Sequence, residues 1–379
     1  MRHFLTLKNF SKEELYEILF IALTYKYNLA DAPSLDSDGV AEKLKTLKPS
    51  KERDKIANKL NLDPRMVGIV LASQSYDITS GIALKNKNVA IILEKPSTRT
   101  RVSFEVGVRQ LGGDVVVLTG NDTQIGRGEP IQDTARVLSR MVDMIIIRTF
   151  DQSRLEELAR FSSVPVINGL TDMYHPAQVL ADMMTLIECG IYECDFAQWW
   201  EDRTRHYTDT FRNFLKSACK PCVAYIGDGN NIAHSWLNLA SIFGLELRIA
   251  TPKGYEPQQE VVDFAKQKAL DSGAKIVILD SAQEAVREAN VVITDTWVSM
   301  GQEEGKQRRI KDFQGFCVDN HLMSLAASEA IFLHCLPAYR GYEVSDEVIE
   351  GQQSRVWDEA ENRLHIQKGI MKWLIEQNQ

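Results

Sequence analysis

The stretch Ser97-Thr-Arg-Thr-Arg101 decides how this 379-residue chain is interpreted. It follows an apolar run at residues 89–93, which predicts a buried strand, and it opens a segment whose apolar residues recur at helical spacing. A valine-rich run at residues 115–118 then predicts the next parallel strand, so the segment forms a βαβ unit. The helix start offers free backbone N–H groups and the positive end of the helix dipole. With hydroxyl and guanidinium groups added, the stretch predicts a site for a phosphate-like dianion.

Apolar runs alternate with helical patterns along the rest of the chain. The expected strands are residues 89–93, 115–118, 144–148 and 164–168 in the first half, and 223–226, 246–250, 275–279, 291–294 and 331–333 in the second. This alternation predicts an α/β fold with two doubly wound parallel-sheet domains, joined by helices that include residues 174–186. The length also favours two cores over one. We expect one domain at residues 1–172 and a second at 173–362.

Composition excludes several classes of function. The net charge of −8 argues against nucleic acid as a partner, and no apolar stretch is long enough to span a membrane. Six cysteines do not predict a disulfide framework. Zinc held by Cys189, Cys194, Cys219 and Cys222 is an alternative that we do not favour, because Cys222 opens a predicted buried strand. A polar segment near residues 27–80 and an aromatic-rich segment near 188–220 have no assigned role.

Four further motifs lie at predicted strand ends or helix starts, where α/β sheets bind ligands. They are His175-Pro-Ala-Gln178, Gly227-Asp-Gly-Asn-Asn231, Asp295-Thr-Trp-Val-Ser-Met-Gly301 and His334-Cys-Leu-Pro337. The two glycines at 227 and 229 do not make a dinucleotide-binding loop, because Ile232 stands where that loop needs a third glycine. The motifs therefore predict one ligand site assembled from many strand ends.

Together these motifs resemble the carbamoyltransferase family, and within it the enzymes that act on ornithine. The likeness extends from residues 2–10 to residues 361–363. It implies a transferase that moves the carbamoyl group of carbamoyl phosphate to the δ-amine of L-ornithine, giving L-citrulline and phosphate in arginine metabolism. No metal and no organic cofactor is implied. Putrescine or N-acetylornithine remains the alternative acceptor, although the loop Ser299-Met-Gly301 favours ornithine.

The resemblance also assigns site residues. Those expected to bind carbamoyl phosphate are Ser97, Thr98, Arg99, Thr100, Gln124, Arg148, His175, Gln178, Cys335, Leu336 and Arg363. Those expected to bind ornithine are Asn231, Asp295, Ser299 and Met300, and the catalytic set is Arg148, His175, Asp295 and Cys335. His175 and Gln178 are three apart at a helix start, so both are expected to donate to the carbonyl oxygen of the substrate. Helix capping is the alternative for His175 and for Asn231.

Assembly and location follow from the resemblance alone. Gln124 matches a position that enters a neighbouring subunit's site, which implies a homotrimer or a multiple of it. The terminal helix, about residues 363–379, is expected to complete the first domain, and the early start of the likeness favours the cytoplasm. The sequence leaves open whether the reaction builds or degrades arginine.

Overall fold

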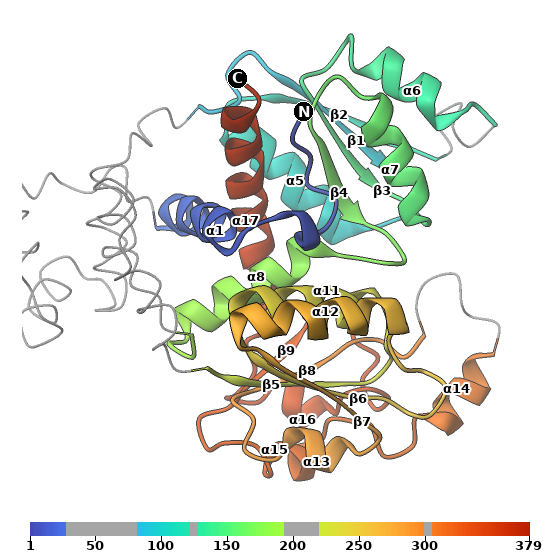
Figure 1. The fold of residues 1–379 in the computed structure, drawn as a ribbon, viewed down its shortest axis with the longest axis vertical. Helices are drawn as coiled ribbons and strands as arrows, with labels where there is room; N and C mark the ends of the chain where they lie inside the picture. The colour runs from blue at the N-terminus through green and yellow to red at the C-terminus, as the bar shows by residue number, and fades with distance from the viewer. Residues whose placement is uncertain (28–81, 121–127, 193–219, 299–304) are drawn as a thin grey trace, which may run out of the picture.

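The computed structural model describes residues 1–27, 82–120, 128–192, 220–298 and 305–379. Two parallel sheets, each with its own helices, form two α/β domains (Figure 1). The first sheet has the order β2-β1-β3-β4, with β1 (Asn88–Leu93), β2 (Asp114–Thr119), β3 (Met144–Arg148) and β4 (Val166–Leu170). The second has the order β7-β6-β5-β8-β9, with β5 (Cys222–Ile226), β6 (Glu246–Ala250), β7 (Lys275–Leu279), β8 (Val291–Thr294) and β9 (Ile331–His334). The predicted fold class is confirmed.

The helices follow the strands in the alternation that the sequence predicts. Those of the first half are α1 (Lys12–Lys26), α5 (Thr98–Gln110), α6 (Ile131–Leu138), α7 (Gln152–Phe161) and α8 (Pro176–Glu188). Those of the second half are α11 (Asn231–Phe243), α12 (Gln259–Ser272), α13 (Ala282–Val286), α14 (Lys306–Asp312), α15 (Asn320–Met323), α16 (Asp346–Ile349) and α17 (Val356–Gln377). No helix of the described ranges is both long and apolar enough to cross a lipid bilayer.

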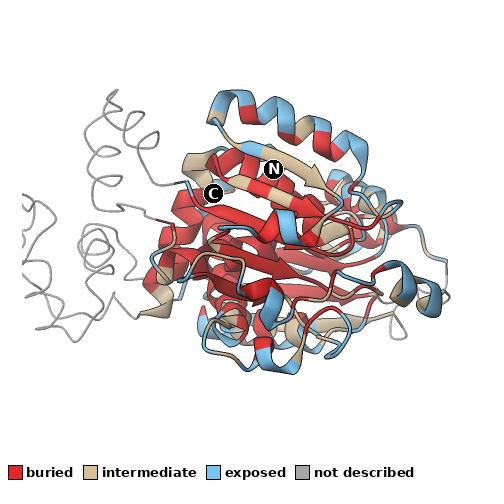
Figure 2. Cartoon of the chain, turned by 90° about the horizontal axis from the view of Figure 1, so that it is seen from below, coloured by how far each residue is buried: buried red, intermediate tan, exposed pale blue. Residues whose placement is uncertain are grey.

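The central strands β3 and β5 are buried at every residue, and the strands of the interior are accordingly red in Figure 2. Such burial is typical of a parallel sheet that helices cover on both faces. In the first sheet Ile91 and Ile146 belong to the cluster that contains Phe104 of α5. Their neighbours Ile92 and Ile147 belong to the cluster under α6 and α7. Successive side chains of a strand point to opposite faces, so one apolar run fills two cores.

The second sheet is filled in the same way. Val223 and Tyr225 lie in the core under α11 and α12, whereas Ala224 and Ile226 lie in the core that includes Phe313. The strand interior therefore needs apolar side chains at every position. This explains why β5 reads in the sequence as a continuous apolar run without alternation.

The helices α8 and α17 join the two halves of the molecule. The terminal helix α17 runs beside α1, α5 and α8, so the end of the chain returns to the first domain (Figure 1). It begins at Val356, earlier than the expected residue 363, and its first turn holds Asp358 and Glu359, which suit a helix N-terminus. Its early start matters because Glu359 and Arg363 come from the same helix, one turn apart.

The fourth strand differs from expectation. The sequence predicted residues 164–168, but β4 spans Val166–Leu170. Pro165 has no N–H to give to the ladder, although its carbonyl still accepts from the N–H of Ile145. The pairing also shifts between Ile147 and Arg148, where the register moves on by one residue. The strand consequently continues past Asn168 and ends at Leu170, two residues later than predicted.

Candidate active site

The strand order gives each sheet one point at which the winding of the chain reverses. In the first sheet the chain reverses direction of winding between β1 and β3, and in the second between β5 and β8. Ligands of open α/β sheets bind outside the carboxyl ends of strands at such switch points. Arg148 ends β3, Asp295 follows β8 and Cys335 follows β9. The predicted site residues are therefore gathered from opposite domains.

Thr100 is the centre of the first half-site. Its backbone N–H donates to Ser97 Oγ at 3.2 Å, the N-cap bond of α5. Its own Oγ1 accepts from Arg363 Nη2 at 2.9 Å and lies 3.4 Å from Arg148 Nη1. Because Thr100 is fully buried, both guanidinium groups that contact it lie inside the protein at the start of α5. Three elements thus converge on one hydroxyl.

The positive charge at this point is concentrated and short of partners. Burial, with repulsion from neighbouring arginines, lowers the pKa of Arg148 and of Arg363 to about 10. Within the described residues, the Nε atoms of Arg99, Arg148 and Arg363 are buried and have no hydrogen-bond partner. Buried donors without partners are rare in proteins and call for an explanation. A bound dianion would satisfy these donors and their charge together.

Arg101 is not part of this cluster. Its Nε lies 3.4 Å from Glu105 Oε2 on the surface of α5, and about half of its side chain is exposed (52%). Positions 99 and 101 are two apart on a helix, so they face different directions. Of the two arginines in the deciding stretch, only Arg99 is directed toward the anion site.

His175 precedes α8 but its side chain does not cap the helix. Its backbone N–H donates to Ser235 Oγ at 2.8 Å, which joins α8 to α11. The ring Nδ1 is buried and has no partner in the described part of the chain. Burial, with Arg363 and Arg148 close by, lowers the pKa of His175 well below its ordinary value. His175 is therefore a neutral imidazole that faces a cationic pocket, and the capping alternative does not hold.

Gln178 is oriented differently from the expectation. Its Nε2 donates to Asp182 Oδ1 at 2.9 Å and to Glu359 Oε1 at 2.8 Å. Both amide hydrogens are then in use, while Oε1 is buried and has no partner among the described residues. In this orientation Gln178 offers an acceptor to a ligand, whereas the sequence predicts a donor to the carbonyl oxygen.

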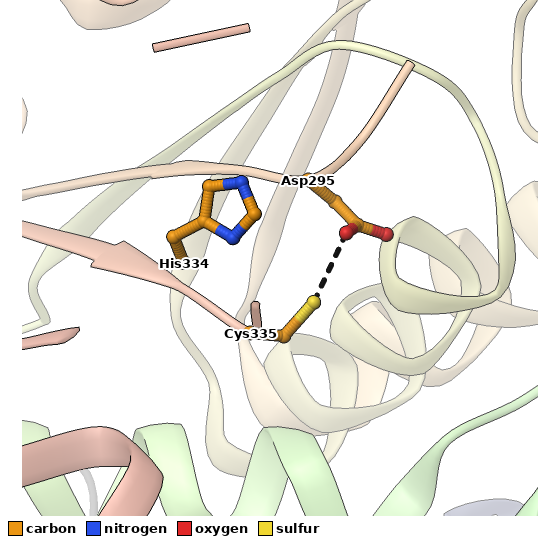
Figure 3. Close-up of side chains that lie close together, drawn as sticks. All are labelled: Asp295, His334 and Cys335. Atoms are coloured by element: carbon orange, nitrogen blue, oxygen red, sulfur yellow. Dashed lines mark hydrogen bonds between the residues drawn. The ribbon is translucent and has the colours of Figure 1, made fainter. Parts of the chain in front are cut away.

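Cys335 and Asp295 meet at the ends of neighbouring strands (Figure 3). Cys335 Sγ donates to Asp295 Oδ1 at 3.0 Å, and the same carboxylate accepts from the N–H of Thr296 at 2.7 Å and from Asn230 Nδ2 at 2.7 Å. Burial, with the negative charge of Asp295, raises the pKa of the Cys335 thiol well above its ordinary value. Cys335 is therefore a neutral hydrogen-bond donor and is not a thiolate.

His334 anchors the loop behind this pair. Its Nδ1 accepts from the N–H of Leu336 at 2.9 Å, which leaves Nε2 to donate to Glu343 Oε1 at 3.3 Å. Leu336 has a positive φ of 57° and precedes a cis peptide bond to Pro337. The imidazole thus holds an unusual backbone turn beside Cys335.

Asp295, His334 and Cys335 also form the one group in the described ranges whose donor atoms all lie within 4.8 Å, as a metal site would require. Their atoms are already engaged, however. The thiol bonds to Asp295, and both imidazole nitrogens of His334 bond elsewhere. The structure therefore gives the donor atoms of all three residues hydrogen-bond partners within the protein. Cys189 and Cys222, from the zinc alternative, are free thiols, and Cys194 and Cys219 lie outside the described residues.

The predicted ornithine side is described in part. Asn231 Nδ2 donates to the carbonyl of Thr171 at 2.7 Å, which ties α11 to the loop after β4. The cap of α11 is Asn230, whose Oδ1 accepts from the N–H of Ile232 at 2.9 Å, so capping is not the role of Asn231. Ser299 and Met300 lie outside the described residues, as does Gln124 of the first domain.

Sequence reasoning missed several residues that support the site. They are Asp182, Asn230, Ser235, Glu343 and Glu359. Asn230 belongs to the motif at residues 227–231, and it contacts Asp295 because β5 and β8, which precede the two residues, are neighbours in the sheet. No signal in the sequence pointed to Asp182 or Glu359, because an acidic residue in a helix is ordinarily exposed.

Comparison with known proteins agrees with this geometry. The family model for the carbamoyl-P binding domain of aspartate/ornithine carbamoyltransferase matches residues 2–188, and the model for the Asp/Orn binding domain matches residues 220–374. The chain belongs to the aspartate/ornithine carbamoyltransferase family. The first model contains every strand of the first sheet and the second model every strand of the second.

Relatives within this family match the whole length of the chain. The ornithine carbamoyltransferase of Helicobacter hepaticus is 49% identical over 378 residues, which are 100% of this chain and 98% of the relative. That of a Nitratiruptor species is 50% identical over 374 residues, 99% and 98% of the two chains. The crystal structure of the anabolic ornithine carbamoyltransferase from Campylobacter jejuni has a TM-score of 0.74 at 38% identity and covers 100% of both chains.

Proposed function

We propose that this member of the carbamoyltransferase family transfers the carbamoyl group of carbamoyl phosphate to the δ-amine of L-ornithine. The products are L-citrulline and inorganic phosphate, as in arginine metabolism. The full-length similarity to proteins named ornithine carbamoyltransferase supports this acceptor over putrescine or N-acetylornithine. The observation that carries the proposal is the convergence of Arg148 and Arg363 on Thr100 at the start of α5.

Carbamoyl phosphate fits the first half-site by charge. Its phosphate is held by Ser97, Thr98, Arg99, Thr100 and Arg148 at the N-terminus of α5, where backbone N–H groups and the helix dipole also favour an anion. The carbonyl oxygen accepts hydrogen bonds from Arg99, His175 and Arg363. These donors strengthen as negative charge grows on that oxygen in the tetrahedral transition state. Cys335 and Leu336 close the other side of the carbamoyl group.

The δ-amine attacks the carbamoyl carbon, and the bond from that carbon to the phosphate oxygen then breaks. The amine must first be neutral, which costs about 4 to 5 kcal/mol at pH 7 for an amine of pKa about 10.4. The neighbouring arginines offset part of this cost because they disfavour the ammonium form. Asp295 and the Cys335 thiol orient the amine, and the departing phosphate takes its proton. Asn231, Ser299 and Met300 hold the α-amino and α-carboxylate groups of ornithine.

We further propose the division of labour that the two sheets support. Residues 1–172, completed by residues 363–379, bind carbamoyl phosphate, and residues 173–362 bind ornithine. The active assembly is a homotrimer, or a multiple of it, in the cytoplasm, in which Gln124 of one subunit completes the site of the next. Sedimentation analysis tests the assembly: the expected mass is three times the chain mass of 42.9 kDa, or a multiple of that value, and a monomer with full activity contradicts it.

The decisive experiment is a panel of amines assayed with carbamoyl phosphate. Purified protein is incubated with L-ornithine, putrescine or N-acetyl-L-ornithine, and the carbamoylated product is measured by mass spectrometry. Citrulline is the expected main product, whereas equal turnover of putrescine overturns the choice of acceptor. Arg99→Ala should abolish turnover and the matched variant Arg101→Ala should not, because Arg101 pairs with Glu105 at the surface.

A further inference from the structure

Two acidic side chains are buried together behind the predicted carbamoyl-phosphate pocket. Asp182 of α8 and Glu359 of α17 are each 1% exposed, although neither has a salt bridge with a basic residue in the described part of the chain. Both contact Gln178, and their carboxyl groups bond to each other. Acidic residues are almost never buried unless they are paired, so this arrangement needs a physical reason.

Each carboxyl group is fixed by a partner that can only donate. Trp236 Nε1 of α11 donates to Asp182 Oδ2 at 3.0 Å, and the backbone N–H of His334 donates to Glu359 Oε2 at 2.8 Å. An indole N–H and a backbone N–H have no acceptor capacity. The oxygens that face them must therefore be acceptors, and the other oxygen of each carboxyl group faces Gln178.

These two anchors determine how the amide of Gln178 is turned. Asp182 Oδ1 and Glu359 Oε1 both accept from Gln178 Nε2, at 2.9 and 2.8 Å. A Gln amide turned the other way would place its oxygen against two oxygens. The observed orientation therefore leaves Oε1 facing away from the pair, buried and without a partner in the described residues. Gln178 is at the start of α8, three residues from His175.

We propose that Asp182 and Glu359 are a positioning pair that holds Gln178 Oε1 toward the carbamoyl group and thereby selects carbamoyl phosphate over other acyl phosphates. This inference rests on the proposed function of the same site. The carbamoyl group carries an NH₂, which can donate to Oε1. Acetyl phosphate has the same shape and charge but a methyl group in place of NH₂. A site that leaves a buried acceptor unpaired binds such an analogue poorly.

The charge of the pair is consistent with this role. Burial raises the pKa of Asp182 to about 7 and that of Glu359 well above its ordinary value. Two buried carboxyl groups in contact retain a proton between them at neutral pH, and the nearby Arg363 balances the remaining charge. The pair can thus remain buried while its outer oxygens accept from Trp236 and His334.

The substitution Asp182→Asn tests the proposal because it changes donors and acceptors without changing shape. The Asn oxygen must face the N–H of Trp236, so its NH₂ faces Gln178 and forces that amide to turn over. Gln178 would then direct a donor, in place of an acceptor, at the carbamoyl NH₂. We expect the affinity for carbamoyl phosphate to fall by about tenfold to a hundredfold, and that for acetyl phosphate to change less than about twofold. Both affinities are measured by titration calorimetry.

Glu359→Gln provides a second route to the same result. The backbone N–H of His334 fixes the Gln oxygen, so the new NH₂ also faces Gln178. If Asp182→Asn does not fold, the proposal is tested by the ratio of the affinities of Glu359→Gln for carbamoyl phosphate and acetyl phosphate. Glu17→Gln is the matched control: Glu17 is a buried carboxylate that accepts from Trp373 Nε1 at 2.9 Å, and its substitution should leave the ratio unchanged.

Two results would overturn the proposal. A folded variant that keeps the wild-type ratio shows that the pair does not direct Gln178. Equal loss of affinity for both acyl phosphates shows general damage to the site and no control of selectivity. A wild-type protein that fails to bind carbamoyl phosphate refutes the proposed function itself, so the two failures are distinct.

Discussion

Replacing Arg363 with methionine should make the ligand-free protein more stable and should abolish its response to carbamoyl phosphate. Arg363 is 4% exposed, and burial, with repulsion from Arg99, lowers its pKa from the ordinary guanidinium value to about 10. A lowered pKa of a cation means that its charged form is disfavoured in the folded state, and this penalty is present at every pH below about 10. The difference corresponds to about 3 kcal/mol at neutral pH.

Methionine fills a similar volume without charge, so this penalty disappears. The variant loses the hydrogen bond from Arg363 Nη2 to Thr100 Oγ1, which contributes about 1 kcal/mol. The net gain is then about 2 kcal/mol in the free energy of unfolding. For a chain of this length that corresponds to a rise in Tm of about 2 to 3 °C.

The assay is thermal unfolding with and without carbamoyl phosphate. At a hundred times its Kd the ligand should stabilise the wild-type protein by about 2.7 kcal/mol, or about 3 °C, and should not shift the variant. Arg101→Met is the control, since that side chain is half exposed and pairs with Glu105; it should change neither Tm nor the response to ligand. The reasoning is refuted if Arg363→Met lowers the Tm of the ligand-free protein and retains the ligand response.

Three further outcomes are expected. Cys335→Ser should retain carbamoyl phosphate binding and lower kcat/KM for ornithine by about tenfold, because it alters one hydrogen bond to Asp295. A wild-type rate in this variant would show that Cys335 contributes to packing only. Burial lowers the pKa of His234 to about 4, and its Nε2 accepts a hydrogen bond from the N–H of Gln258 at 3.0 Å. The neutral ring therefore contributes to the free energy of unfolding above about pH 6.5, and this contribution should decline by about 2 kcal/mol at pH 5. Urea unfolding at pH 7 and pH 5 should show a smaller decline in His234→Gln; an equal decline assigns the effect to other groups. Citrulline formation should survive treatment with EDTA, whereas its loss would give Asp295, His334 and Cys335 the role of metal ligands.

Much of the fold could be predicted from the sequence because the relevant signals are local. Eight of the nine expected strands overlap the observed ones closely, since each is a short apolar run bounded by turn residues. The exception is β4, which is displaced by two residues. Its position depends on the missing N–H of Pro165 and on a register shift against β3, and the second of these is a property of the neighbouring strand.

The location of the site was predictable for the same reason, but the role of its side chains was not. Each motif follows a strand, and parallel strands end at one edge of the sheet. The sequence therefore identified Arg99, Arg148, Asp295 and Cys335 as neighbours. It could not show that Gln178 presents an oxygen, because Asp182 and Glu359 determine that orientation and are themselves fixed by Trp236 and His334.

By itself the sequence determined two parallel sheets and predicted an anion site at the start of α5, because apolar periodicity, helix caps and strand-end motifs are local patterns of consecutive residues. Only the tertiary structure decided that Arg363 reaches Thr100 across 263 residues of chain and that His175 is neutral. It also decided that Cys335 is a thiol. Hydrogen-bond direction and pKa depend on every group within a few ångströms, and those groups come from distant parts of the chain.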